Sequence, residues 1–199
     1  ARTLTTLPNP LTVADVASAV QRLEAGMRHQ AVSLTGGEPL LHRAFLDDLI
    51  PRLHDQGLAT YLETNGLLPT AMAALATPPR YIAMDLKLPS VAGIVAPWAT
   101  HRAFLEAAVA QLARAGVGAR QHLQVKIVFG EESLGDLADA AAIFAGYDDV
   151  PCILQPLTPG PTTPNAPTPA TVLEAQRLLA ATLNDVRVIP QTHVLLRQW

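Results

Sequence analysis

Short apolar runs alternate with longer stretches of helical spacing along nearly the whole chain. Apolar runs of about four to eight residues, such as 81–86, are typical of buried strands. Segments such as 42–56, where apolar residues recur three or four positions apart, indicate amphipathic helices. The pattern predicts strands at 31–34, 59–62, 81–86, 122–129, 152–155 and 186–189, and helices at 13–25, 42–56, 69–76, 100–115, 133–145 and 171–183.

Capping residues and prolines mark where several of these elements begin and end. Thr12 followed by Asp15 is a variant of the capping box, and Thr100 and Ser133 are expected to cap the helices that follow them. The proline-rich stretch 157–169 is expected to be a stiff loop, either a lid over a site or a surface connector.

Strands and helices that alternate in this way predict an α/β fold with a parallel sheet and right-handed crossovers. No linker or repeat divides the chain, so residues 1–199 are expected to form one domain. Six strands follow an opening helix, which favours a partial TIM-like barrel whose first strand is not seen. A doubly wound sheet is the alternative, because periodicity does not separate the two. In either fold, ligands are expected beyond the carboxyl ends of the strands.

The composition narrows the class of protein. Of the 199 residues, 49% are hydrophobic, which excludes an intrinsically disordered chain. The formal charge of −3 gives no electrostatic case for a nucleic-acid or membrane partner. A single cysteine, Cys152, excludes an intrachain disulfide and any metal site built from several cysteines of this sequence. Such cysteine usage fits a reducing compartment, so a cytoplasmic protein is expected.

Polar residues follow the predicted strands at the end where ligands are expected. Both lysines of the chain, Lys87 and Lys126, lie at or near strand ends. Gly36 and Gly37 free the backbone for positive φ and for close approach of a ligand. Exposed N–H groups there would hold a carboxylate, and Glu38 would accept from an ammonium group, so the turn suits an amino-acid head group. Glu63, Asn65, Asp85 and Gln155 end other strands.

Five motifs, in the order that a known family shows, carry a resemblance. Residues 32–41 resemble the glycine-rich signature of radical S-adenosylmethionine enzymes. Residues 61–66, 84–90, 154–157 and 189–193 follow it in that order. Together they resemble the 7-carboxy-7-deazaguanine synthase group of that superfamily, over nearly the whole chain.

The resemblance implies a partial (β/α)6 barrel that binds S-adenosylmethionine and a [4Fe–4S] cluster, with Mg²⁺ as a further metal. The cofactors would generate a 5′-deoxyadenosyl radical that abstracts a hydrogen atom from 6-carboxy-5,6,7,8-tetrahydropterin, and the lyase would form a deazapurine precursor of queuosine. The barrel would position and shield the cofactors. The implied partners are the small-molecule substrate, an electron donor such as flavodoxin or ferredoxin, and a second copy in a homodimer.

The resemblance also assigns roles to residues at matching positions. Thr35 and His193 are expected to face the substrate. Glu63, Asn65 and Lys126 are expected on the same rim, the edge of the barrel at the carboxyl ends of the strands, without an assigned role. The residues expected to contact S-adenosylmethionine are Gly36, Gly37, Glu38, Asp85, Leu86, Lys87, Gln155, Pro156, Leu157 and Thr158.

The N-terminal part of the sequence departs from the pattern of the family. The family holds its cluster with a cysteine-rich loop after the first strand, and none of those cysteines is among these residues. The same loop would supply a threonine to Mg²⁺. A barrel without its first strand leaves an edge unpaired beside residues 31–34, so a preceding segment is expected in the working protein.

Two other classes of function compete with this interpretation. A Schiff-base aldolase would also place a lysine at a barrel strand end, with Glu63 or Asp85 as acid or base. It would leave the glycine turn unexplained. A barrel without a cluster could instead bind S-adenosylmethionine alone, or serve as an assembly subunit.

Overall fold

The computed structural model describes residues 10–160 and 165–196, without the side chains of His193 and Leu195. Within these residues, six parallel strands form one sheet in which each strand pairs with the next along the chain. A doubly wound sheet would reverse its strand order part-way, so the sequential order decides for the partial barrel. The strands are β1 (Val32–Leu34), β2 (Thr60–Thr64), β3 (Tyr81–Leu86), β4 (Leu123–Phe129), β5 (Cys152–Pro156) and β6 (Val186–Val188).

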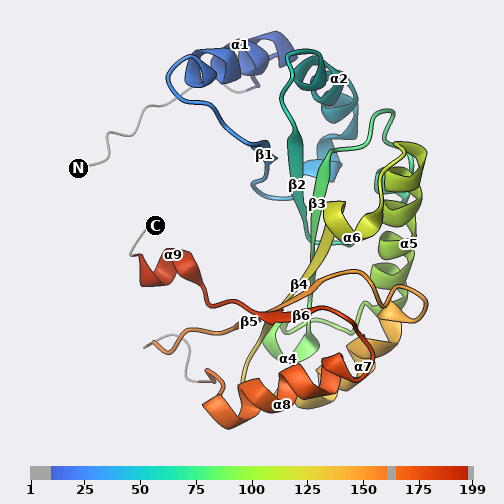
Figure 1. Cartoon of the computed structure of the whole chain (residues 1–199), viewed down its shortest axis with the longest axis vertical. Coiled ribbons are helices and arrows are strands. Elements are labelled where there is room, and N and C mark those ends of the chain that lie inside the picture. The colour runs from blue at the N-terminus through green and yellow to red at the C-terminus, as the bar shows by residue number, and fades with distance from the viewer. Residues whose placement is uncertain (1–9, 161–164, 197–199) are drawn as a thin grey trace.

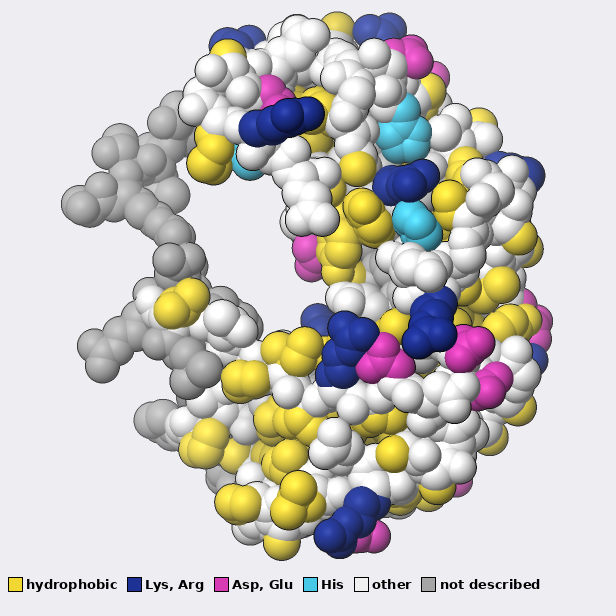
Figure 2. Space-filling view, viewed as in Figure 1, with side chains coloured by type: hydrophobic (Ala, Val, Ile, Leu, Met, Phe, Trp, Pro, Cys, Tyr) yellow, Lys and Arg dark blue, Asp and Glu magenta, His cyan; other side chains and the backbone are white. Residues whose placement is uncertain are grey.

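The sheet curves into an open ring, with the larger helices on its outer side (Figure 1). Its edge strands β1 and β6 lie on either side of the opening, which appears as a deep hollow in Figure 2. The helices are α1 (Val13–Glu24), η1 (Pro39–His42), α2 (Arg43–Asp55), α3 (Pro69–Ala73), α4 (Pro89–Ala92), α5 (Trp98–Arg114), α6 (Ala119–His122), α7 (Leu134–Ala141), η2 (Ala142–Phe144), α8 (Pro169–Ala180) and α9 (Thr192–Leu195).

Burial alternates along the strands and separates an apolar outer face from a polar inner face. In β3, the side chains of Ile82 and Met84 are buried in the core with the helices. Asp85, next along the strand, is only partly buried and points to the other face. The alternation in β4 puts Lys126 on that same face, opposite Asp85 in the strand register. The inner face therefore carries the polar side chains toward the hollow.

Several predicted boundaries are confirmed, and two predicted caps are wrong. Thr12 and Asp15 form the capping box of α1, with the Asp15 amide donating to Thr12 Oγ1 over 3.1 Å. Thr100 lies inside α5, because that helix already begins at Trp98, after Pro97. Ser133 precedes α7, but its hydroxyl accepts from the Gly130 amide over 3.0 Å and caps no helix amide.

The short helices η1, α4, α6 and α9 were not predicted, because three or four residues are too few to show a helical period. The predicted helix 133–145 is α7 followed by the 3-10 turn η2, and the helix predicted at 171–183 begins at Pro169. Among the described helices, none combines the length and apolar character needed to span a bilayer.

Candidate functional site

The glycine turn after β1 offers backbone groups that the chain itself leaves free. Gly36 has φ +94° and Gly37 has φ +59°, a region that favours glycine. A Cβ atom at either position would meet open space, so nothing of the described chain covers the turn. Within the described residues, no hydrogen bond engages the backbone of Gly36 or Gly37. The turn is therefore available to a ligand at both its N–H and its carbonyl groups.

Glu38, next in the chain, turns its carboxylate inward and is only 8% exposed. Its Oε1 accepts from the Leu40 amide over 3.1 Å and from the Thr64 hydroxyl over 2.9 Å. Its Oε2 accepts from the Asn65 amide over 2.8 Å. The side chain thus ties the glycine turn to the end of β2, and it does not line the neighbouring pocket. Its predicted contact with a cofactor stays a prediction.

Asp85 carries a buried oxygen atom that has no hydrogen-bond partner in the described structure. Its Oδ2 accepts a hydrogen bond from Lys87 Nζ, whereas Oδ1 is buried and accepts none. Lys126 Nζ lies 3.8 Å from Oδ1, beyond hydrogen-bond distance. Native proteins rarely leave a buried polar atom unsatisfied, so the vacancy at Oδ1 points to a ligand that donates a hydrogen bond.

A pocket of about 160 Å³ brings these groups together at the carboxyl ends of β1 to β4. Glu63 lies on its wall, and its Oε1 accepts from the Ser33 hydroxyl over 2.7 Å. The pocket joins six of the predicted site residues, because the lining comprises Thr35, Gly37, Glu63, Thr64, Asn65, Ala83, Met84, Asp85 and Lys126. Sequence reasoning did not single out Ser33 for the site.

His101 of α5 is a further residue that sequence reasoning missed. Its side chain is fully buried, its Nε2 accepts from the Lys87 amide over 3.1 Å, and its Nδ1 lies 3.1 Å from the Gly66 carbonyl oxygen. Because Nε2 accepts a hydrogen bond it carries no proton, and Nδ1 must donate to the carbonyl, so the ring is neutral with its proton on Nδ1. Burial lowers the pKa of His101 to about 4, which is consistent with this form. His101 therefore fixes the ends of β2 and β3 relative to each other.

The other predicted cofactor residues lie outside this pocket. Leu86 is 1% exposed and its side chain is in the core, so only its backbone can face the site. Gln155 and Pro156 end β5, and the Leu157 amide donates to the Phe129 carbonyl over 2.9 Å. The Thr158 amide donates to Gln191 Oε1 over 3.0 Å, which joins this segment to the start of α9. His193 lies in α9, and its side chain is outside the described residues.

The described residues do not fit an iron–sulfur cluster. Cys152 is the single cysteine, and it is buried in β5. Burial raises the pKa of Cys152 to about 12, so its thiol is not a ready source of the thiolate that ligates iron. Within the described part of the chain, no group of three or more His, Cys, Asp or Glu side chains could hold a metal ion.

Comparison with known proteins places this geometry in a family. The chain is 39% identical over 189 residues to 7-carboxy-7-deazaguanine synthase of Geobacter sulfurreducens, covering 93% of this chain and 71% of that protein. The chain belongs to the 7-carboxy-7-deazaguanine synthase family. It is therefore an enzyme of that type, and the predicted family is confirmed.

Solved structures agree with the fold assigned to this synthase-family chain. QueE from Escherichia coli is 21% identical, with a TM-score of 0.58 over 91% of this chain and 64% of that one. SuiB of Streptococcus suis, solved bound to S-adenosylmethionine, is 14% identical, with a TM-score of 0.56 over 94% of this chain and 45% of that one. No protein-family model matches the chain. The predicted partial barrel is confirmed.

Proposed function

We propose that this synthase-family chain binds S-adenosylmethionine across the glycine turn and Asp85, and converts 6-carboxy-5,6,7,8-tetrahydropterin to 7-carboxy-7-deazaguanine. One observation carries the cofactor site: the free backbone of Gly37 and the unsatisfied Oδ1 of Asp85 line the same pocket. The homology to the Geobacter synthase supports the reaction.

The amino-acid head group of S-adenosylmethionine matches the groups that the chain leaves free. The N–H groups of Gly36 and Gly37 can donate to its carboxylate, and the carbonyl groups of the same turn can accept from its ammonium group. The buried Oδ1 of Asp85 is an acceptor for an ammonium or hydroxyl donor of the same molecule. The segment 155–158 at the end of β5 is assigned to the adenosine part.

Lys126 and Thr35 are assigned to the substrate side of the pocket, with His193 expected from α9. The Lys126 ammonium group lies 3.8 Å from Asp85 Oδ1, in an ion pair without a hydrogen bond, so its N–H donors can bind the carboxylate of the pterin substrate. Lys87, by contrast, is hydrogen-bonded to Asp85 and holds that carboxylate in place.

S-adenosylmethionine, when bound, would supply a 5′-deoxyadenosyl radical after taking up one electron from an external reductant and releasing methionine, and that radical would take a hydrogen atom from the substrate. This chain's residues bind and orient the cofactor and the substrate at the strand ends. The thiolates of a [4Fe–4S] cluster are not supplied by these 199 residues, and no described residue is assigned to Mg²⁺. An electron donor such as flavodoxin or ferredoxin and a second copy of the chain stay predictions.

The decisive experiment compares two glycines of similar backbone conformation. Gly37 has φ +59° at the pocket, and Gly116 has φ +72° after α5, and a Cβ atom at either would meet open space. Alanine therefore introduces similar backbone strain at both positions. In calorimetry with S-adenosylmethionine, Gly37→Ala is expected to weaken binding about tenfold or more and Gly116→Ala less than about twofold.

Equal affinities in the two variants would contradict the cofactor site. The substrate assignment has its own readout, because mass spectrometry of the reaction with the pterin must show the deazapurine product. Borohydride trapping of a carbonyl substrate is expected to give no adduct, since Lys87 and Lys126 both form ion pairs with Asp85 and a Schiff base needs a free amine. A trapped adduct at Lys87 or Lys126 would favour the aldolase.

A further inference from the structure

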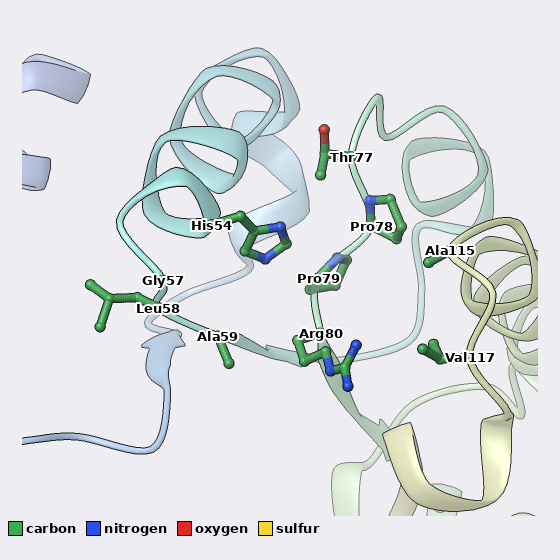
Figure 3. Close-up of a pocket in the computed structure, with 10 residues that line it drawn as sticks. All are labelled: His54, Gly57, Leu58, Ala59, Thr77, Pro78, Pro79, Arg80, Ala115 and Val117. Atoms are coloured by element: carbon green, nitrogen blue, oxygen red, sulfur yellow. The ribbon is translucent and has the colours of Figure 1, made fainter.

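A second pocket lies at the opposite, amino-terminal end of the sheet. It has a volume of about 410 Å³, and its walls come from the end of α2, the segment before β3 and the turn after α5 (Figure 3). Its lining comprises His54, Gly57, Leu58, Ala59, Thr77, Pro78, Pro79, Arg80, Ala115 and Val117. None of these residues lines the pocket at the strand carboxyl ends, so the two pockets are separate.

One cationic group in this pocket has no partner among the residues that the structure describes. The guanidinium group of Arg80, an exposed residue, makes neither an ion pair nor a hydrogen bond within the described part of the chain. The Thr60 hydroxyl accepts from the Arg80 amide over 3.3 Å and lies 3.0 Å from His54 Nε2. Either tautomer of His54 fits this contact, so its Nδ1 atom can serve a ligand as donor or as acceptor.

The electrostatics of the pocket favour an anion. Burial lowers the pKa of His54, the charge of Arg80 acts in the same direction, and Asp55 opposes both. In Figure 3, the imidazole ring of His54 is directed toward Pro79, and the guanidinium group of Arg80 lies on the other side of Pro79, directed away from His54 and toward the side of Val117. A guanidinium group without a carboxylate partner presents its donors in a fork that matches a carboxylate or phosphate group.

The remaining walls are apolar and suit a flat ring. Pro78 and Pro79 present two pyrrolidine rings, and Leu58 and Val117 add aliphatic surface. The volume falls within the range of small-molecule sites, which combine apolar walls with a few placed polar groups. The pocket thus joins an apolar slot to one cationic group.

We propose that this pocket binds a small molecule in which a flat ring carries one oxyanion group. The oxyanion pairs with Arg80, and the ring lies against Pro78, Pro79 and Val117. The site goes beyond the reaction at the carboxyl ends of the strands, because it lies at the other end of the sheet. Carboxylate and phosphate ligands share this chemistry, and the probes below separate them.

Calorimetry on the full chain tests the proposal with four probes. Guanosine 5′-monophosphate and quinoline-2-carboxylate each join a ring to an anion, whereas guanosine lacks the anion and inorganic phosphate lacks the ring. At least one ring–anion probe is expected to bind with a dissociation constant of about 1 mM or below, and about tenfold tighter than guanosine or phosphate. Preference for the nucleotide or for the carboxylate identifies the source of the anion.

Two variants and one control locate the binding. Arg80→Ala removes the cation, and Ala115→Glu adds a competing carboxylate at an exposed position on the pocket wall. Each is expected to weaken the bound probe about tenfold, whereas Arg22→Ala, at an exposed arginine of α1, changes it less than about twofold. In NMR, the probe must shift the ring signals of His54 and leave those of His29 unchanged.

The proposal is overturned if neither ring–anion probe binds at about 5 mM, a concentration that would detect millimolar affinity. It is equally overturned if guanosine or phosphate binds as tightly as the joined molecule, or if the Arg80 and Arg22 variants behave alike. An unchanged melting temperature in Arg80→Ala shows that lost binding is not lost folding.

Discussion

The two ends of the barrel differ in how the polar groups of their pockets are held. At the carboxyl ends of the strands, hydrogen bonds within the chain hold the side chains around the pocket: Glu38 accepts three hydrogen bonds and His101 engages two backbone groups. At the amino ends other residues form ion pairs, but the exposed guanidinium group of Arg80 has no partner in the described structure. The difference shows how a preorganised site is built: most of its side chains form hydrogen bonds within the chain, and these bonds hold the few unsatisfied ligand-binding atoms, such as Asp85 Oδ1, in place.

The largest effect on cofactor affinity is expected when the carboxylate of Asp85 itself is removed. Asp85→Ala removes the carboxylate beside Lys87 and Lys126 and leaves both ammonium groups without their partner. We expect S-adenosylmethionine affinity to fall about 30- to 100-fold, the usual cost of truncating one member of a partly buried charge pair. Calorimetry and turnover measure the loss.

The matched change at the amino end is Asp185→Ala, which removes the partner of Arg187 at the start of β6. It is expected to change affinity and turnover less than about twofold, since the residue is remote from the pocket lining. Comparable losses in both variants would remove the distinction between the two ends.

The next effect is a dependence of stability on pH. The pKa of His101 is about 4 in the folded protein and about 6.5 when exposed, so an unfolded chain takes up the proton first as pH falls. Stability from this group is complete above about pH 6.5 and is lost as pH falls toward 4. Between pH 6.5 and 5 the free energy of unfolding should drop by about 2 kcal/mol.

Urea unfolding at several pH values measures this slope, and His101→Asn should flatten it. The pKa of His54 is also lowered, so a smaller slope of the same sign is expected to remain in the variant. A variant as steep as the wild type would exclude His101 as the cause.

A smaller effect separates two glutamates of the same rim. Glu38→Ala leaves the Thr64 hydroxyl and the Asn65 amide without an acceptor, which should lower the free energy of unfolding by about 1.5 kcal/mol. Glu63→Ala removes only an exposed bond to Ser33 and should cost about 0.5 kcal/mol or less. Chemical unfolding distinguishes them, and a reversed order would mean that Glu38 does not hold the rim.

A further small effect is expected at the amino end. His122 stacks on Tyr81 with ring centroids 5.3 Å apart, and its Nδ1 lies 2.9 Å from the Arg80 carbonyl oxygen at an exposed position. His122→Ala should cost less than about 1 kcal/mol of stability and leave turnover unchanged. A fall in turnover in this variant would show that the two ends are coupled.

Local sequence patterns predicted those strands and helices whose ends are marked by prolines or capping residues. The strand 81–86 was predicted with its observed bounds, because its apolar run is flanked by Pro79 and by Pro89. The start of α5 was predicted at Thr100, since threonine is a common cap, but Pro97 takes the position before the first turn. Short helices carry too few residues for any period to be seen.

The predicted site residues that line the pocket are, apart from Gly37, polar residues that directly follow, or lie near the end of, a predicted strand. Thr35, Gly37, Glu63, Asn65, Asp85 and Lys126 meet in one pocket because parallel strands bring their carboxyl ends together. His101 could not be predicted, because its position in the sequence indicates a surface or core-edge residue, whereas in the fold it is buried and joins Gly66 to Lys87. The inward turn of Glu38 depends on Thr64 and Asn65, which lie 26 and 27 positions away.

The buried thiol of Cys152 also determines how this molecule can be labelled. Maleimide dyes react with thiolates, and a thiol with a pKa near 12 inside β5 offers almost none at neutral pH. Cysteines introduced by Arg22→Cys in α1 and Arg177→Cys in α8, exposed positions that line neither pocket, would therefore be the reactive attachment points for a donor and an acceptor dye. Fluorescence energy transfer between the two dyes would report, with Cys152 left in place, whether the two sides of the open ring move when either pocket is filled.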